Sequence, residues 1–263
     1  MSVKYQNDDP IEVGEVEDAA APEAVEVSGF GFPLYTSVLV SCIIAVFIVQ
    51  AMYDPQGIGL SALSLAELRP SILAAGFVKP AFVNGEYWRL LTGAALHGGL
   101  IHIFFNSYAF YSFGRLFEFL SNRAHLAIVF VLAAAGGGVL SLIFMPEGIS
   151  VGASGGVLGL ISYLAVYAFK RRQFVSAEFR KNLLFNIGFV LIFGLVLFQV
   201  VDNYGHIGGL LVGAAYGAIQ IPTDPYIDPR SAGTVTSFFG LFAMGLFIAV
   251  CIFSSYLIMF AAV

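Results

Sequence analysis

Two residues whose side chains can perform hydrolysis lie at the ends of apolar stretches long enough to cross a membrane. Ser154 lies in the run GASGG, and His206 lies in the run YGHIGG. Polar and ionisable side chains at bilayer depth are costly, and those that occur there usually have a function. A hydroxyl nucleophile beside a histidine base is the arrangement used in nucleophilic catalysis. The pair therefore predicts hydrolysis carried out inside a membrane.

Each of these two residues also has a reading without chemistry. A serine at a helix start often caps the helix, and a membrane histidine can be a polar contact or a metal ligand. Glycines beside Ser154 favour the catalytic reading, because they leave free N–H groups that can hold an oxyanion. A stripe of glycines at every fourth position, 205 to 217, predicts tight helix packing. From this stripe we expect Gly209→Leu to lose most activity and Gly209→Ala to keep a good part.

A third polar group lies upstream, where HGGLIHIFFN begins a further apolar stretch. At about 100° per residue, His102 and Asn106 share one helix face. Both can donate hydrogen bonds, which suits an oxyanion hole. His97 lies off that face and is expected nearer the outer surface. Asp202, one turn before His206, is either an orienting partner for the ring or, in the preferred reading, an acid favoured at a helix N-terminus. The predicted mechanism is a dyad.

The composition places the chain among polytopic membrane proteins. Of its 263 residues, 59% are hydrophobic and 11% are charged, whereas soluble domains carry roughly 25% charged residues. The apolar stretches have about the 20-residue length of a membrane-spanning helix and are too continuous for barrel strands. We therefore predict an all-α membrane protein, a polytopic helical bundle. Cys42 and Cys251 lie within apolar stretches and are interpreted as small core residues.

Charge is distributed unevenly along the chain. Residues 1–31 hold eight acidic residues against one lysine, a net charge of −7, with little bulky apolar content. This composition predicts a disordered, acidic cytoplasmic tail. The first residues lack the pattern of a cleavable signal peptide, so the first span is expected to be an uncleaved anchor. Residues 32–221 are predicted to hold six spans, and residues 222–263 a linker and a seventh transmembrane helix.

A long non-spanning segment, 53–92, separates the first two spans. Its stretch 60–73 looks helical and suits the membrane interface, as do Trp88 and Arg89. Residues 146–153 look like a re-entrant loop before Ser154. The predicted spans are 33–52, 97–119, 125–145, 154–169, 183–201, 204–221 and 238–262.

Together these motifs resemble the rhomboid family of intramembrane serine proteases, over about residues 32–221. The resemblance rests on Trp88-Arg89, on His97, His102 and Asn106, on the GASG run at Ser154, and on His206 with its glycine stripe.

The resemblance implies that Ser154 is the nucleophile and His206 the base. His102, Asn106 and the backbone at Ser154 would form the oxyanion hole. The implied fold is a six-helix core followed by one further span. The implied partners are single-span membrane proteins, cleaved near their outer end within the lipid bilayer. No cofactor, metal ion or nucleic acid is expected.

Three further positions follow from the resemblance. Gly152 would lie next to the oxyanion hole, and His97 would be a supporting polar residue near the water entrance. Many family members carry an aromatic residue four positions after the serine, packed on the catalytic histidine. Here that position is Leu158, a departure that bears on rate more than on mechanism.

Two other functions remain open on sequence alone. An inactive relative would bind membrane clients, and the intact Ser154 and His206 argue against it. A transporter would use His97, His102 and His206 as a metal or proton path, and it leaves the GASG run unexplained. A fluorophosphonate probe that labels the wild type but not Ser154→Ala would exclude the first, and metal-dependent activity would favour the second.

The orientation of the spans gives a testable prediction. With the N-terminus inside, nine lysines and arginines fall on the inner side and three on the outer side, as the positive-inside rule requires. Ser154 and His206 then lie toward the outer face of the cell membrane. With Cys42 and Cys251 replaced, a membrane-impermeant thiol reagent should label a cysteine added near Phe82 in intact cells but not one near Arg171. The reverse labelling would place the site toward the cytoplasm.

Overall fold

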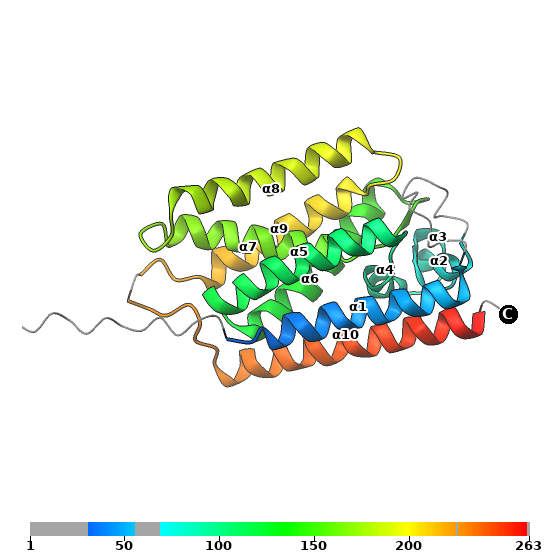
Figure 1. Cartoon of the computed structure of the whole chain (residues 1–263), viewed down its shortest axis with the longest axis horizontal. Helices are drawn as coiled ribbons and strands as arrows, with labels where there is room; N and C mark the ends of the chain where they lie inside the picture. Colours follow the sequence, from blue (N-terminus) through cyan, green and yellow to red (C-terminus); the bar gives the residue numbers. More distant parts are fainter. Residues whose placement is uncertain (1–30, 56–68, 225, 262–263) are drawn as a thin grey trace, which may run out of the picture. The chain divides into compact units, whose positions relative to one another are not determined.

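Seven long helices make up most of this computed structural model, which describes residues 31–55, 69–224 and 226–261 (Figure 1). The predicted tail and most of the stretch 60–73 fall outside these ranges. The all-α fold class is confirmed, and each long helix falls on a predicted span. The helices are α1 (Leu34–Tyr53), α5 (Leu100–Leu120), α6 (Arg123–Phe144), α7 (Ser154–Lys170), α8 (Ala177–Val196), α9 (Asn203–Gln220) and α10 (Thr234–Ala261).

The largest difference from the predicted spans is at the start of α8. This helix begins at Ala177, six residues before the predicted start at 183. The Ser176 hydroxyl caps it by accepting a hydrogen bond of 3.1 Å from the Phe179 N–H. A polar first turn therefore extends the helix beyond its apolar part, which apolar content alone did not indicate.

Hydropathy and length separate the long helices into two groups. Among the described residues, α1, α6, α8 and residues Thr234–Phe260 of α10 are long and apolar enough to cross a membrane by composition alone. The remaining three, α5, α7 and α9, carry His102, Ser154 and His206. These three helices are shorter or have a lower mean hydropathy, because they contain polar residues and glycines.

The helices that carry the site are central to the bundle. α9 packs against both α6 and α7, and α5 packs against α1 and α7. α1 and α10 run side by side, and α10 also contacts α6 (Figure 1). α8 contacts α7 and α9 and buries only Leu183 and Gly194 along its length. The site is therefore built on the best-packed helices, and α8 is the most loosely held.

Short elements fill the segment between α1 and α5. They are α2 (Pro70–Ala75), β1 (Phe77–Val78), α3 (Lys79–Val83) and α4 (Arg89–Ala95). β1 pairs antiparallel with β2 (Ile149–Ser150), with Phe77 opposite Ser150. The region 146–153, predicted as a re-entrant loop, thus includes a strand whose backbone groups are satisfied by pairing.

Arg89 is buried against the protein. It is 7% exposed, and its guanidinium donates to the carbonyl oxygens of Leu73 and Gly76 and to the Glu86 carboxylate. The Arg89 donors therefore bind their own segment of the protein, and the place of Arg89 at the depth of the headgroups stays a prediction. Trp88 is half-exposed and contacts the Phe253 ring of α10 edge to face.

The linker before α10 is held by polar contacts with the ends of neighbouring helices. The Arg171 guanidinium donates to the carbonyl oxygens of Asp224 and Ile227. The Asn122 amide donates to the Arg230 carbonyl oxygen at 3.0 Å. The division of the chain into a core at 32–221 and a linker with a last helix at 222–263 stays a prediction.

Candidate functional site

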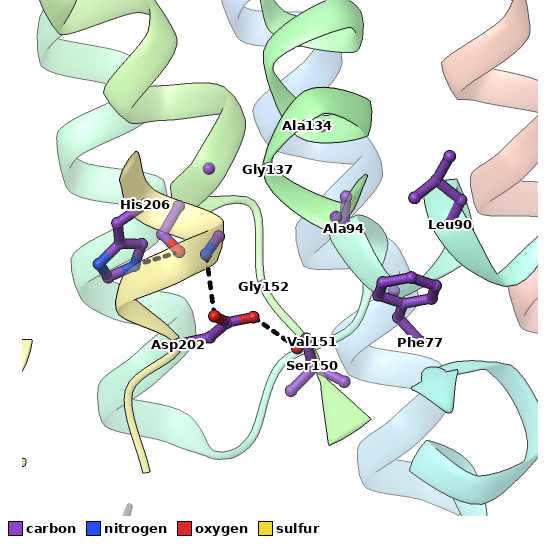
Figure 2. Close-up of a pocket in the computed structure, with 15 residues that line it drawn as sticks. Phe77, Leu90, Ala94, Ala134, Gly137, Ser150, Val151, Gly152, Asp202 and His206 are labelled. Atoms are coloured by element: carbon purple, nitrogen blue, oxygen red, sulfur yellow. Dashed lines mark hydrogen bonds between the residues drawn. The ribbon is translucent and has the colours of Figure 1, made fainter. Parts of the chain in front are cut away.

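Ser154 and His206 lie within hydrogen-bond distance of each other. Ser154 is the first residue of α7, and His206 lies in the first turn of α9. The His206 Nε2 atom is 2.8 Å from the Ser154 Oγ atom (Figure 2). His206 is 7% exposed and Ser154 is half-buried. This geometry lets the imidazole take the hydroxyl proton directly.

Glycines allow α9 to approach α7 until the two backbones touch. A Cβ atom added at Gly209 would lie 2.0 Å from the Gly155 carbonyl oxygen, and one added at Gly213 would lie 1.9 Å from that of Gly159. Side chains cannot be accommodated at such distances. The glycine stripe therefore faces the helix that begins with Ser154, and it sets the short distance between the two helices.

A second glycine contact joins α9 to α6. A Cβ atom added at Gly137 would lie 2.5 Å from the Gly205 carbonyl oxygen, and one added at Gly208 would lie 2.6 Å from that of Gly136. His206 stands between these two glycines of α9. Its ring position is consequently fixed by backbone packing on two neighbouring helices.

Gly152 turns the chain just before Ser154. Its φ angle is +123°, a conformation that residues with a Cβ rarely adopt. Its N–H donates to the Gly93 carbonyl oxygen at 2.9 Å. A Cβ atom at this position would lie 2.8 Å from the His102 Nε2 atom. Only glycine lets the His102 ring approach the backbone next to Ser154.

His102 presents its Nε2 atom toward this turn. The His102 Nδ1 atom accepts a hydrogen bond of 3.2 Å from the Gly98 N–H, so the proton of the neutral ring is on Nε2. Asn106 is 7% exposed, and its amide donates to the His102 carbonyl oxygen at 3.1 Å. His102 thus has a donor directed at Gly152, whereas one N–H of Asn106 is engaged with its own helix.

His97 is fully buried within the protein, and its place near the outer surface and the water entrance stays a prediction. The Gln50 side chain of α1 covers it, accepting from the His97 N–H at 3.0 Å and donating to its carbonyl oxygen at 3.2 Å. The His97 ring packs edge to face on His102, with 5.1 Å between ring centroids. His97 therefore supports His102 from within the bundle. Gln50 showed no signal in the sequence beyond being one polar residue in an apolar stretch.

Asp202 caps α9, as the preferred reading of the sequence predicted. One carboxylate oxygen accepts a hydrogen bond of 2.8 Å from the Gly205 N–H. The His206 Nδ1 atom has no hydrogen-bond partner in the described part of the chain, so the carboxylate does not bind the ring. The other oxygen accepts from the hydroxyls of Ser141 and Ser150. The sequence did not single out these two serines, because hydroxyls are common in membrane helices and turns.

A recess with a mixed lining opens beside Ser154, with polar side chains from Ser150, Asp202 and His206 as well as apolar ones (Figure 2). It is lined by side chains of α4, β1 and the segment before α7, among them Leu90, Phe77 and Val151.

Leu158 stands at the position where the resemblance to the rhomboid family led us to look for an aromatic residue, and it is 2% exposed. Of the rings in the described residues, none packs against His206. Nor do those residues contain a group of three or more His, Cys, Asp or Glu side chains arranged to hold a metal ion.

Comparisons with known proteins agree on one family. The family model for the Rhomboid domain matches residues 84–223. The chain is 34% identical over 143 residues to the RHOMBOID-like protein 6, mitochondrial, of Arabidopsis thaliana, covering 54% of this chain and 47% of that protein. It is 34% identical over 140 residues to the Rhomboid protease GluP of Bacillus subtilis, covering 53% of this chain and 27% of that protein.

A further relative is the Rhomboid-like protease 3 of Toxoplasma gondii. Identity to it is 30% over 149 residues, covering 56% of this chain and 57% of that protein. The chain therefore spans between about a quarter and three fifths of the length of these three relatives.

The glycine contact at position 209 gives a prediction that corrects the expectation from sequence. Because a Cβ atom would lie 2.0 Å from the Gly155 backbone, Gly209→Ala should already push α9 away from α7. A displacement of about 1 Å in a catalytic group can cost on the order of 10²-fold in rate. We expect Gly209→Ala, and not only Gly209→Leu, to lose most of the labelling of Ser154 by a fluorophosphonate probe. In the matched control Gly245→Ala, the added Cβ atom meets nothing within 4 Å, and labelling should stay at the wild-type rate. Equal labelling of Gly209→Ala and Gly245→Ala would contradict this account of the packing.

Proposed function

The chain belongs to the rhomboid family, and we propose that it is an intramembrane serine endopeptidase that cleaves single-span membrane proteins through a Ser154–His206 dyad. One observation carries the proposal: the 2.8 Å contact between the Ser154 Oγ and His206 Nε2 atoms. A serine hydroxyl is a weak nucleophile until a base removes its proton. The contact supplies that base on a largely buried histidine.

In the proposed mechanism, the first step forms an acyl-enzyme. His206 Nε2 takes the proton of the Ser154 hydroxyl while Oγ attacks the carbonyl carbon of the scissile peptide bond. The resulting imidazolium then donates this proton to the leaving amine nitrogen, and the C–N bond breaks. In the second step, a water molecule loses a proton to His206 and attacks the acyl carbon, which releases the new carboxyl group and restores the Ser154 hydroxyl.

The negative charge of each tetrahedral intermediate needs donors near Ser154. Ser154 is the first residue of α7, so the N–H groups of the first turn are free of helical partners. The proton on His102 Nε2 adds a side-chain donor beside Gly152. We assign these groups to the oxyanion hole, with Asn106 as a further contributor. Gly152 admits the His102 ring, and His97 supports that ring from behind.

The setting of the site supports a substrate held in the bilayer. Ser154 begins a helix within a bundle of apolar helices, and the recess beside it offers room for a side chain next to the scissile bond. With the N-terminus in the cytoplasm of a cell, the cleavage position lies toward the outer face of the cell membrane. We therefore propose single-span proteins, cut near their outer end, as the substrate class.

The dyad makes a prediction about single and double variants. Ser154→Ala and His206→Ala should each abolish cleavage of a single-span protein on co-expression, while both variants still insert into the membrane. Because the two residues act as a unit, the double variant should lose no more than either single one. Cleavage is followed by immunoblotting with a panel of single-span proteins. Full activity in either single variant would rule out the dyad, and metal-dependent activity would favour transport over proteolysis.

The oxyanion assignment predicts a graded loss. Loss of one donor to the oxyanion costs roughly 10²–10³-fold in rate in serine hydrolases. We expect His102→Ala to approach that range and Asn106→Ala to lose less, because one Asn106 N–H already donates to the His102 carbonyl oxygen.

Steady-state turnover of both variants tests this order, with Asn186→Ala as the matched control. Asn186 makes the same bond to the carbonyl oxygen four residues before it, in α8. Unchanged turnover in the double variant His102→Ala/Asn106→Ala would remove both residues from the oxyanion hole.

A further inference from the structure

The Asp202 carboxylate connects α9, which carries His206, with β2, the strand that precedes Ser154. Its Oδ1 atom accepts from the Gly205 N–H at 2.8 Å, and its main-chain oxygen accepts from the His206 N–H at 3.1 Å. Asp202 thereby holds the first turn of α9, which carries the His206 ring. These bonds are local and are those expected of any good helix cap.

The other carboxylate oxygen of Asp202 accepts hydrogen bonds from two elements other than α9. Asp202 Oδ2 accepts a hydrogen bond of 2.6 Å from the Ser150 hydroxyl in β2 and a second from the Ser141 hydroxyl in α6. Ser141 is fully buried, and the two hydroxyl oxygens are 3.3 Å apart. One carboxylate therefore joins α6, β2 and α9, and Figure 2 shows its bonds to β2 and α9.

The short segment between Ser150 and Ser154 has little conformational freedom. Ser150 is four residues before Ser154 and is paired with Phe77 of β1. Between the two serines, the Gly152 N–H is bonded to the Gly93 carbonyl oxygen at 2.9 Å. The position of Ser150 consequently sets where α7 begins and where the Ser154 hydroxyl points.

A cap alone does not require a carboxylate. Serine, threonine and asparagine cap helices about as well as aspartate, and each needs only one oxygen for that purpose. A carboxylate has two oxygens with about four acceptor sites, and hydroxyl bonds to a charged acceptor are shorter and stronger than neutral ones. Both oxygens of Asp202 accept hydrogen bonds, one from α9 and the other from β2 and α6.

We propose that Asp202 is a positioning residue that sets the distance between His206 and Ser154 by binding Ser150 and Ser141. It acts through the backbone of both elements and not through the imidazole, whose Nδ1 atom has no partner in the described residues. The proposal rests on the proposed protease function, because it assigns a role within that dyad.

The decisive variant is Asp202→Ser, which keeps a capping oxygen but is too short to reach Ser150 and Ser141. We expect kcat to fall by about 10-fold or more, since displacements near 1 Å cost on the order of 10²-fold, with KM unchanged. Asp202→Asn keeps two polar atoms at the same reach and should lose less than Asp202→Ser. The matched control is Asp228→Ser. Within the described residues the Asp228 side chain binds only Arg230, in an exposed turn, so kcat should match the wild type.

A second set of variants leaves Asp202 untouched and guards against a folding defect at α9. Ser141→Ala/Ser150→Ala removes both hydroxyl donors and should reproduce the kcat loss of Asp202→Ser. The triple variant should lose no more than either, because all three residues make one connection. Additive losses, or wild-type kcat in Asp202→Ser, would reduce Asp202 to a helix cap and overturn the proposal.

Amide hydrogen exchange tests the same connection without any reaction. In detergent-solubilised protein carrying Asp202→Ser, the peptide covering residues 149–154 should exchange faster than in the wild type, although it lies about fifty residues away in sequence. The Asp228→Ser control should leave that peptide unchanged. If the wild type cleaves no substrate but this exchange difference appears, the protease function fails while the structural connection stands. If cleavage occurs and the difference is absent, the positioning role fails alone.

Discussion

The site depends on one packing constraint, the direct contact of glycine backbones between α9 and its two neighbours. At Gly209 and Gly213 a single added carbon would overlap the backbone of α7, and at Gly208 it would approach the backbone of α6. In a membrane, helices gain no hydrophobic driving force from meeting each other, so close van der Waals contact has to supply the association. The same contact carries His206 to within 2.8 Å of Ser154. The packing of the helices and the geometry of the proposed dyad therefore have a common origin.

The second feature of the site is the way in which its buried polar groups are satisfied. An unpaired polar group in a low-dielectric interior is expensive, and most of those around the dyad are bonded. Gln50 binds both backbone groups of His97, and Asp202 collects two hydroxyls and one N–H. The atoms that stay unpaired in the described residues include His206 Nδ1 and both ring nitrogens of His97. The backbone of His97 is thus held firmly while its ring nitrogens have no partner there, whereas His206 Nε2 and His102 Nδ1 are both bonded.

The two sides of the bundle differ in how tightly they hold the site. On one side, α10 packs on α1 and α6, and its Phe247 ring meets Phe130 of α6 at 4.9 Å between centroids. Phe130 in turn lies against Gly156, two residues after the nucleophile. On the other side, α8 buries little of its surface. The helix added after the first six is therefore part of the support of α7, and the exposed face of α8 is the more adaptable one.

The sequence by itself determined the class of protein, the seven helical stretches and the residue types of the proposed dyad. Apolar length and helix periodicity can be read from a short stretch of sequence, because they do not depend on which residues pack against it. The sequence also indicated that the glycine stripe serves packing. Only the tertiary structure decided how close that packing is, and so that alanine at Gly209 is already too large. It likewise decided that Arg89 and His97 are buried, and that Asp202 reaches Ser141 and Ser150. These results depend on contacts between residues that are distant in sequence, across α1, α6, β2 and α9. Local sequence patterns do not specify such contacts.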